Sequence, residues 1–169
     1  CDNYLEGFHI PFVHSGLNEV LDYGKYETEI HGLLNLQIGH SSGGEHVFDL
    51  PENHEDFGKQ ISAYYFWIFT NMMFNFYPWG CSINVVKPIA LNRTKVSFIT
   101  YVWDESKLDT GAGAALDKVE REDEFVVEGV FKGMHSRIYQ TGRFSPKMEK
   151  GVHHFHGLFF RSNQVAIQS

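Results

Sequence analysis

The clearest indication of the fold is the run Ala63-Tyr64-Tyr65-Phe66-Trp67-Ile68-Phe69-Thr70-Asn71-Met72-Met73-Phe74-Asn75-Phe76. It is dense in aromatic residues and β-formers, and Asn71 marks a turn between two strands. Tyr77-Pro78-Trp79-Gly80 marks a second turn, and further strands are expected at 82–87 and 95–103. Upstream, residues 25–38 alternate between polar and apolar and are expected to form a half-buried strand. Strands joined by short turns are typical of an antiparallel meander.

A helix is expected downstream of these strands, from about residue 116 to 134, after a linker at 111–113. Its apolar stripe is Val119, Val126, Val127, Val130 and Met134. Asp123 falls in the middle of this stripe, whereas its acidic neighbours, Glu122 among them, mostly point toward the rim or solvent. A buried carboxylate is costly unless it is paired, hydrogen-bonded or bound to a cation. Asp123 is therefore either the partner of an arginine, such as Arg137 or Arg143, or a metal ligand.

Candidate partners for a metal lie at the other end of the chain, where His9 and His14 are separated by five positions. On an unbroken helix their rings would be about 140° apart, too far round to share one ion. Pro11 removes a helical N–H and biases Ile10 away from the α region. We expect a short helix over 2–10 that Pro11 kinks or ends, followed by a turn at Ser15-Gly16, so that His14 swings back beside His9. The alternative is two unrelated histidines.

Composition describes an ordinary globular protein of 169 residues, of which 43% are hydrophobic. The net charge of −7 and the lack of a basic run argue against nucleic acid and anionic membranes as partners. Cys1 and Cys81 have no metal-binding or disulfide context, which fits a reducing compartment, and a cytoplasmic location is expected. No signal peptide or membrane span is apparent. The abrupt start at Cys1 suggests a piece of a longer chain.

Other segments carry weaker signals. Residues 39–59 are polar and loop-like, either a flap over a pocket or a surface excursion. The three histidines in 153–156 could bind metal by themselves, support other ligands, or lie where the last helix docks. The remaining histidines are interpreted as surface residues: His31, His40, His46, His54 and His135.

Two histidines and one carboxylate on one face of an ion leave positions open for oxygen and substrate. This is the ligand set of non-haem Fe(II) oxygenases. Zinc in the same site would instead give a hydrolase. Glu6 lies three residues before His9, where its carboxylate can accept from the imidazole or reach another group. It could equally be a solvated acid near a helix N-terminus.

These residues carry a family resemblance. The run Asp2-Asn3-Tyr4-Leu5-Glu6-Gly7-Phe8-His9-Ile10-Pro11-Phe12-Val13-His14 resembles the iron-binding motif of Rieske-type ring-hydroxylating oxygenase α subunits. Glu120-Arg121-Glu122-Asp123 resembles that family's later acidic helix. Arg143-Phe144-Ser145-Pro146 and Gly151-Val152-His153-His154-Phe155-His156 resemble its closing segment. The opening and closing runs look most like the branch that contains choline monooxygenase and related quaternary-ammonium oxygenases.

The resemblance implies an α+β helix-grip (START/Bet v1-like) fold, with a curved antiparallel sheet wrapped on a long C-terminal helix. It implies that 1–169 is a single mononuclear-iron catalytic domain, with Fe(II) between His9, His14 and Asp123. In the family an acid before the first histidine ligand links this iron to a Rieske centre on the neighbouring subunit, and Glu6 matches that position. Tyr4, Gly7 and Ile10 flank the ligands and are expected to line the substrate cavity.

The family's Cys-x-His and Cys-x-x-His pairs are absent from this sequence. The [2Fe–2S] cluster is therefore expected on a Rieske domain outside this chain, although a divergent stand-alone domain is the alternative. The implied partners are O2, a small organic substrate, a reductase and a homotrimer when the chain is full length. The substrate would be aromatic or a quaternary ammonium, hydroxylated or oxidatively demethylated. A cage of rings could bind such a cation through cation–π attraction, or simply fill a core: Tyr64, Tyr65, Trp67, Phe74, Phe76 and Trp79. The rival from another class is a helix-grip module that binds a ligand without chemistry.

Overall fold

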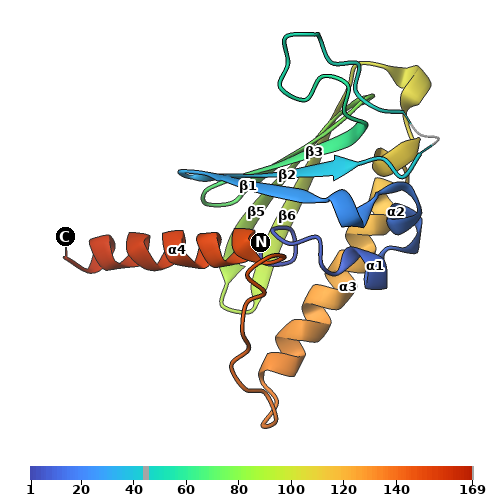
Figure 1. Ribbon diagram of the computed structural model, residues 1–169. Coiled ribbons are helices and arrows are strands. Elements are labelled where there is room, and N and C mark those ends of the chain that lie inside the picture. Colours follow the sequence, from blue (N-terminus) through green and yellow to red (C-terminus); the bar gives the residue numbers. More distant parts are fainter. Residues whose placement is uncertain (44–45, 169) are drawn as a thin grey trace.

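A six-stranded antiparallel sheet forms the centre of the chain in the computed structural model, which describes residues 1–43 and 46–168 (Figure 1). The strands follow one another in the order β1-β2-β3-β4-β5-β6, so the predicted meander is confirmed. The elements are α1 (Ile10–Val13), α2 (Ser15–Val20), β1 (Glu27–His31), β2 (Leu34–His40), β3 (Ile61–Ile68), β4 (Met72–Tyr77), β5 (Gly80–Ala90), β6 (Arg93–Val102), α3 (Leu116–Met134) and α4 (Lys150–Gln168). Short 3-10 turns lie at Tyr23–Lys25, Glu105–Lys107 and Gly111–Gly113.

The turns of the sheet lie largely where the sequence places them. Asn71 sits between β3 and β4, and Tyr77 pairs with Gly80 across the next turn. One expectation was wrong: residues 25–38 are not a single strand but the hairpin of β1 and β2. Gly32, at φ +58°, makes that turn, a backbone conformation that glycine adopts without a steric penalty. The alternation that we interpreted as one strand therefore belongs to two.

The aromatic side chains of the sheet divide between its two faces, because successive residues of a strand point in opposite directions. Tyr64 pairs with Phe76 and Phe66 with Phe74, which places these rings on one face. Tyr65 and Trp67 point to the other face. The six rings therefore cannot together surround a single ligand, which excludes the alternative of one aromatic cage.

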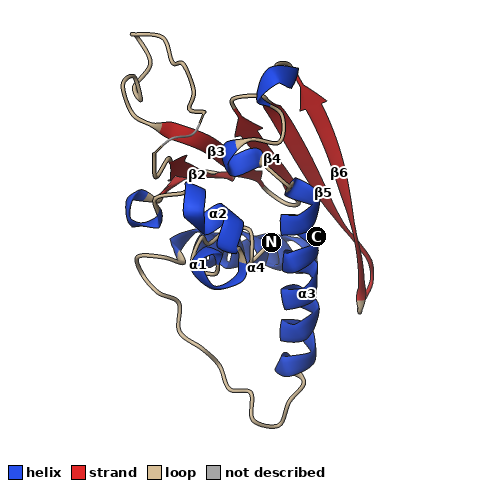
Figure 2. Ribbon diagram, turned by 90° about the vertical axis from the view of Figure 1, so that its right-hand side faces the viewer, coloured by secondary structure: helices blue, strands red, loops and turns tan. Residues whose placement is uncertain are grey.

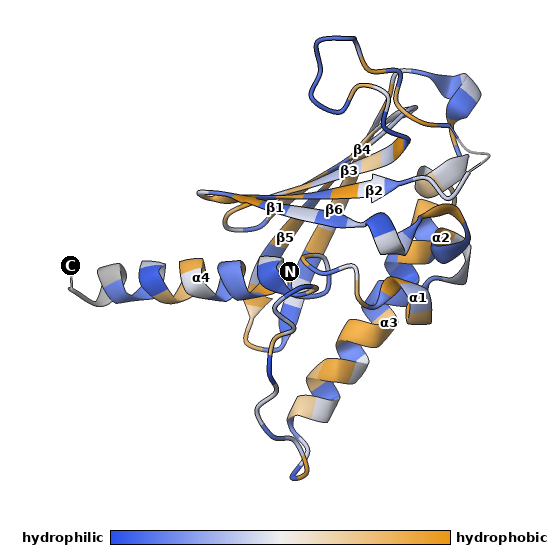
Figure 3. Cartoon of the chain, viewed as in Figure 1, coloured by the Kyte–Doolittle hydropathy of each residue, from blue (hydrophilic) through white to orange (hydrophobic). Residues whose placement is uncertain are grey.

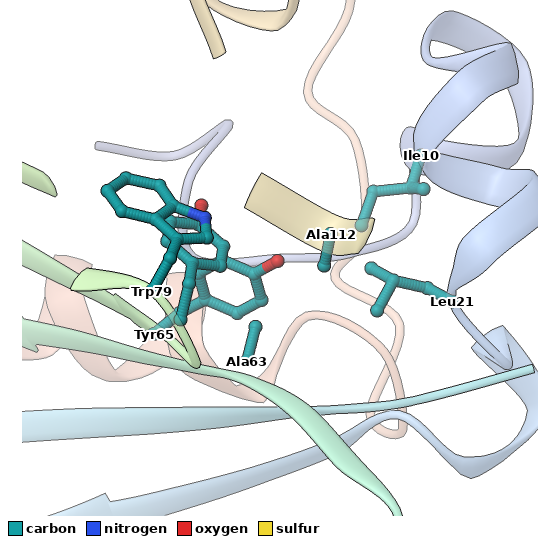
Figure 4. Close-up of a cluster of buried hydrophobic side chains, with 7 residues drawn as sticks. Ile10, Leu21, Ala63, Tyr65, Trp79 and Ala112 are labelled. Carbon is teal, nitrogen blue, oxygen red and sulfur yellow. The ribbon is translucent and has the colours of Figure 1, made fainter. Parts of the chain in front are cut away.

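One face of the sheet, which we call the inner face, is covered by the N-terminal segment and by the start of α4. Leu5 and Val152 pack there with Trp67, which is completely buried. A neighbouring cluster joins Tyr65 to Ile10 and to Trp79, together with Leu21, Ala63 and Ala112 (Figure 4). The first residues of the chain are thereby fixed against the middle of the sheet.

The opposite, outer face carries the segment 46–60. Phe48 packs on Tyr64 with 5.2 Å between the ring centroids. The buried carboxylate of Asp56 accepts hydrogen bonds from the Tyr64 hydroxyl at 2.8 Å and from Lys59 Nζ at 2.6 Å. Burial by itself raises the pKa of Asp56, but these two bonds outweigh it and the pKa is lowered. The segment is a fastened surface excursion, not a flap over the inner face; residues 44–45 lie outside the described part.

The N-terminal segment differs from the expected helix over 2–10. Residues 2–9 form turns, and α1 begins only at Ile10, with Pro11 in its first turn. Pro is favoured there because the N–H that it lacks would have no helical partner. Ser15-Gly16 is not a turn between elements but the start of α2. Pro11 therefore starts a helix where we expected it to end one.

Helix α3 spans the predicted residues, but its apolar stripe is not buried. No residue of α3 is buried, and Phe125 is 81% exposed. Leu116 packs on the Tyr65–Trp79 cluster, after which the helix runs away from the sheet (Figures 1 and 2). Several of its hydrophobic residues are consequently exposed, among them Val127, Val130 and Met134, and Figure 3 shows how much of this helix is hydrophobic. Periodicity identified the helix correctly, but the described chain supplies no element to cover its later turns.

Candidate metal centre

Three side chains from two distant parts of the chain converge on one point. His9 lies immediately before α1, His14 lies between α1 and α2, and Asp123 lies in the second turn of α3. His14 Nε2 is 3.0 Å and His9 Nε2 is 3.5 Å from the same oxygen, Asp123 Oδ1. One ligand atom from each residue lies within 4.8 Å of the others, and the described residues contain no other such group of three.

The local backbone explains how the two imidazoles meet. Because the chain turns at 2–9 and α1 is only one turn long, His9 and His14 flank that turn rather than lying on one continuous helix. Their ring centroids are 5.1 Å apart, with the planes at 79°. The predicted approach of the two rings is observed, although it arises from a short helix between them and not from a kinked one.

The far side of each imidazole is held by a carboxylate. His9 Nδ1 lies 2.6 Å from Glu6 Oε1, and Glu6 Oε2 accepts from the His9 backbone N–H at 3.0 Å. His14 Nδ1 lies 2.8 Å from Glu122 Oε2. Both rings therefore use Nδ1 for a carboxylate and turn Nε2 toward Asp123, the arrangement in which outer carboxylates orient metal-bound histidines.

Sequence reasoning missed two residues that support the site, Glu122 and Asn3. Glu122 was grouped with neighbours that mostly point toward the rim or solvent; its side chain is 30% exposed, but its carboxylate faces His14. Asn3 donates from Nδ2 to Asp123 Oδ1 at 2.7 Å. A short helix signal before His9 gave no indication that Asn3 would reach α3. For Glu122, its position next to Asp123 was the only available signal.

Electrostatics bind the cluster together. Burial by itself lowers the pKa of His14, whose side chain is 2% exposed, but hydrogen bonds to Asp123 and Glu122 outweigh this and raise it. Burial raises the pKa of Asp123, yet its bonds to His14 and Asn3 and the charge of His14 lower it. Asp123 has no Lys or Arg partner among the described residues, so the interpretation of Asp123 as the partner of Arg137 or Arg143 was wrong.

The three side chains fit a divalent metal ion, because their nitrogen and oxygen donor atoms all point toward one another. Two imidazole Nε2 atoms and a carboxylate suit iron, zinc, nickel or copper, and iron is the metal typical of this ligand set with open positions.

Glu120, one turn before Asp123 on the same helix face, has no hydrogen bond or ion pair with any described residue. Burial and the charges of nearby acids raise the pKa of Glu120 to about 7.

The three residues expected to flank the ligands are engaged in packing. Tyr4 donates from its hydroxyl to Asn75 Oδ1 at 2.7 Å. A Cβ on Gly7 would stand 2.9 Å from Tyr26 Cε1, so the close approach requires glycine. Ile10 is buried in the Tyr65–Trp79 cluster. That Tyr4, Gly7 and Ile10 line a substrate cavity stays a prediction.

The other histidines lie away from the centre. His154 Nδ1 is 2.9 Å from Asn35 Oδ1 on β2, and His156 Nε2 is 2.9 Å from Asp2 Oδ1, so both fasten α4 to the inner side of the molecule. His153 packs edge-on against Phe144. These residues form no metal group of their own within the described chain.

One of the five histidines interpreted as surface residues is not on the surface. His40 is buried at the end of β2, and its Nε2 lies 2.8 Å from Glu27 Oε1. We expected the strand to end at Ile38. Because β2 continues to His40, this side chain belongs to the sheet and is buried. His31, His46, His54 and His135 are exposed, as expected.

Comparison with known proteins identifies the family. Residues 1–159 match the family model of the ring hydroxylating alpha subunit (catalytic domain). The chain belongs to this family. The motif of 2–14 and the acidic segment of α3 both lie inside the matched residues.

Plant proteins are among the relatives of this ring-hydroxylating catalytic domain. It is 36% identical to the chloroplastic choline monooxygenase of Arabidopsis thaliana, over 94% of this chain and 37% of that protein. It is 32% identical to the chloroplastic choline monooxygenase of Beta vulgaris, over 92% of this chain and 34% of that protein. The chain thus spans about a third of the length of these relatives.

Solved structures confirm the fold class. The quaternary ammonium Rieske monooxygenase CntA, in complex with an inhibitor, superposes with a TM-score of 0.66 at 22% identity, over 94% of this chain and 44% of that one. The same enzyme with L-carnitine gives 0.61 at 21% identity, over 94% and 43%. The α+β helix-grip architecture is shared. None of the described helices combines the length and the hydrophobicity that a membrane span requires.

Proposed function

We propose that residues 1–169 form a single mononuclear non-haem iron domain of a Rieske-type oxygenase. In this proposal His9, His14 and Asp123 hold Fe(II). The observation that carries it is the approach of two imidazole Nε2 atoms, at 3.0 and 3.5 Å, to one oxygen of Asp123. Three protein ligands leave coordination positions open, which a closed structural site would not.

The bound metal would supply O2 activation for hydroxylation or oxidative demethylation of a small organic substrate. The chain's own residues would prepare the site for that chemistry. Glu6 and Glu122 hold the Nδ1 atoms and so leave Nε2 of each ring free to bind. Asn3 fixes the rotamer of Asp123 through the bond to Oδ1.

Electrons would come from a [2Fe–2S] cluster on a Rieske domain of a neighbouring subunit, with Glu6 between the two centres. Support comes from CntA, a fold neighbour whose structure gives insight into inter-subunit electron transfer. Glu6 is suited to the role because one carboxylate already contacts both the ring and the backbone of His9. A reductase and a homotrimeric assembly complete the proposal.

The substrate class that we propose is a quaternary ammonium. The plant relatives are choline monooxygenases, and CntA is a quaternary ammonium monooxygenase. Within this chain, Glu120 offers a carboxylate without a counter-ion one turn from Asp123, which suits a cationic substrate. We propose Tyr4, Gly7 and Ile10 as neighbours of that substrate.

We also propose a reducing compartment such as the cytoplasm, which the two free cysteines fit. The names of the plant relatives place those proteins in the chloroplast.

Iron uptake tests the proposed function. Protein prepared without oxygen is mixed with Fe(II), desalted and assayed for bound iron. We expect one iron per chain in the wild type and none in His14→Ala. His153, an exposed residue of α4, gives the matched control His153→Ala, which should bind iron as the wild type does. Iron retained in His14→Ala, or zinc bound in strong preference to iron, would refute the assignment.

A second experiment tests the role of Glu6 in the full-length protein with its reductase. Glu6→Gln, supplied with Fe(II) in excess, should still take up iron but lose product formation from a quaternary ammonium substrate. Undiminished product formation would remove Glu6 from the electron path while leaving the metal site intact.

A further inference from the structure

The imidazole of His14 is clamped between two consecutive carboxylates of α3. Its Nδ1 faces Glu122 Oε2 at 2.8 Å and its Nε2 faces Asp123 Oδ1 at 3.0 Å. Consecutive helix residues point about 100° apart, so two adjacent acids can reach opposite edges of one ring. The ring is almost fully buried, which leaves it few alternatives to these two partners.

The clamp decides which nitrogen of His14 can bind a metal. A neutral imidazole donates from one nitrogen and offers a lone pair on the other. An ionised carboxylate only accepts, so Glu122 requires the proton on Nδ1 and leaves the lone pair on Nε2, toward Asp123 and His9. A carboxylate behind an imidazole also makes that ring a stronger metal donor.

We propose that Glu122 is a positioning residue for the metal centre, holding His14 in the orientation and tautomer that bind the ion. This inference rests on the proposed function, since it assumes that His14 is a ligand. Glu6 holds a histidine only three residues away in its own segment, so its contact does not join distant parts of the chain. Glu122 is 108 residues from His14, so it also fastens the ligand-bearing N-terminal segment to α3.

The second oxygen of Glu122 has a much weaker partner. Lys118 Nζ lies 3.7 Å from Glu122 Oε1, and the lysine side chain is 67% exposed. Exposed pairs of this kind contribute little, because solvent screens them and long side chains lose entropy. Lys118 therefore serves as a control: Lys118→Met removes the ion pair but leaves the contact between Glu122 and His14 intact.

A merely structural Glu122 would join α3 to the N-terminal segment without affecting the metal. The two roles are separated by measuring the dissociation constant for Fe(II), the visible spectrum of the Co(II)-substituted protein and the melting temperature of the metal-free protein. A structural role changes only the melting temperature. A positioning role changes the dissociation constant and the Co(II) spectrum, which reports the ligand geometry.

We expect Glu122→Gln to weaken Fe(II) binding by about 10- to 100-fold, the range for residues that orient a ligand, and to shift the Co(II) spectrum. Lys118→Met and Glu124→Gln should stay within about twofold of the wild type. Glu122→Asp keeps the charge but withdraws the carboxylate by one methylene, and should fall between Glu122→Gln and the wild type. It also provides the readout if Glu122→Gln does not fold.

The outcomes are distinguishable. If the wild type takes up no Fe(II), the proposed function and this inference both fail. If the wild type binds Fe(II) and the Glu122 variants bind it equally well with an unchanged Co(II) spectrum, only the positioning role of Glu122 is overturned.

Discussion

Replacing Asp123 by Asn should abolish most of the stabilisation that the protein gains from iron. The change keeps the size of the side chain and an oxygen that can accept from Asn3, so the metal-free fold should persist. It removes the charged oxygen that lies 3.0 Å from His14 Nε2 and 3.5 Å from His9 Nε2. An uncharged amide oxygen binds Fe(II) more weakly than a carboxylate oxygen, because it lacks the negative charge that attracts the cation.

The magnitude follows from linkage. At a free Fe(II) concentration 100 times the wild-type Kd, binding stabilises the fold by about 2.7 kcal/mol. If Asp123→Asn weakens binding by about 100-fold, the same concentration gives about 0.4 kcal/mol. The difference of about 2.3 kcal/mol corresponds to roughly 5–9 °C in Tm for a protein of this size.

The assay is thermal unfolding without oxygen, with and without Fe(II), for the wild type, Asp123→Asn and the control Glu124→Gln. Each variant is compared with its own metal-free form, so a change in intrinsic stability does not enter the result. Glu124 is exposed on the same helix and should leave the iron-dependent shift unchanged. An equal rise in Tm for Asp123→Asn and the wild type would refute the ligand role of Asp123.

Three further changes test the packing that supports the site. Asp56→Asn should lower the free energy of unfolding by about 1–3 kcal/mol at pH 7, measured by urea unfolding. Because the pKa of Asp56 is lowered in the folded state, the difference from the wild type should disappear only as the pH falls below 3.8 and through the folded pKa. Equal stability of the two proteins at pH 7 would contradict this prediction. Trp67→Ala should destabilise the fold by about 3–5 kcal/mol in the same assay, because the side chain is fully buried, and a loss below 1 kcal/mol would show that its packing is misjudged. Gly7→Ala should lower the free energy of unfolding by about 1–3 kcal/mol, because its new methyl group would stand 2.9 Å from the ring of Tyr26. A variant as stable as the wild type would show that the Tyr26 ring can move aside at little cost.

Much of the architecture could be predicted because short-range patterns specify it. Turn residues such as Asn71 and Gly80 separate the strands of the sheet, and helical periodicity gave α3 its bounds. The hairpin at Gly32 was missed because the alternation of polar and apolar residues continues unchanged from β1 through the two-residue turn into β2. The position of His40 was missed for a related reason, since strand ends are set by pairing partners, here Ile61 on β3.

The candidate site was predicted in part. His9, His14 and Asp123 are each unusual in their own segment, which is why the sequence singles them out. Asn3 and Glu122 are ordinary polar residues by that measure. Their importance arises only when α3 meets the N-terminal segment, and no local pattern encodes that contact. The exposure of the α3 stripe was unpredictable for the same reason, because periodicity identifies an apolar face but not what covers it.

The most direct test of the central claim is a crystal structure of the protein soaked with Fe(II) under anaerobic conditions, with data collected at the iron absorption edge. We expect one strong anomalous peak within coordinating distance of His9 Nε2, His14 Nε2 and a carboxylate oxygen of Asp123. An iron peak elsewhere, for instance beside His153 or His156, with none between these three residues, would contradict it.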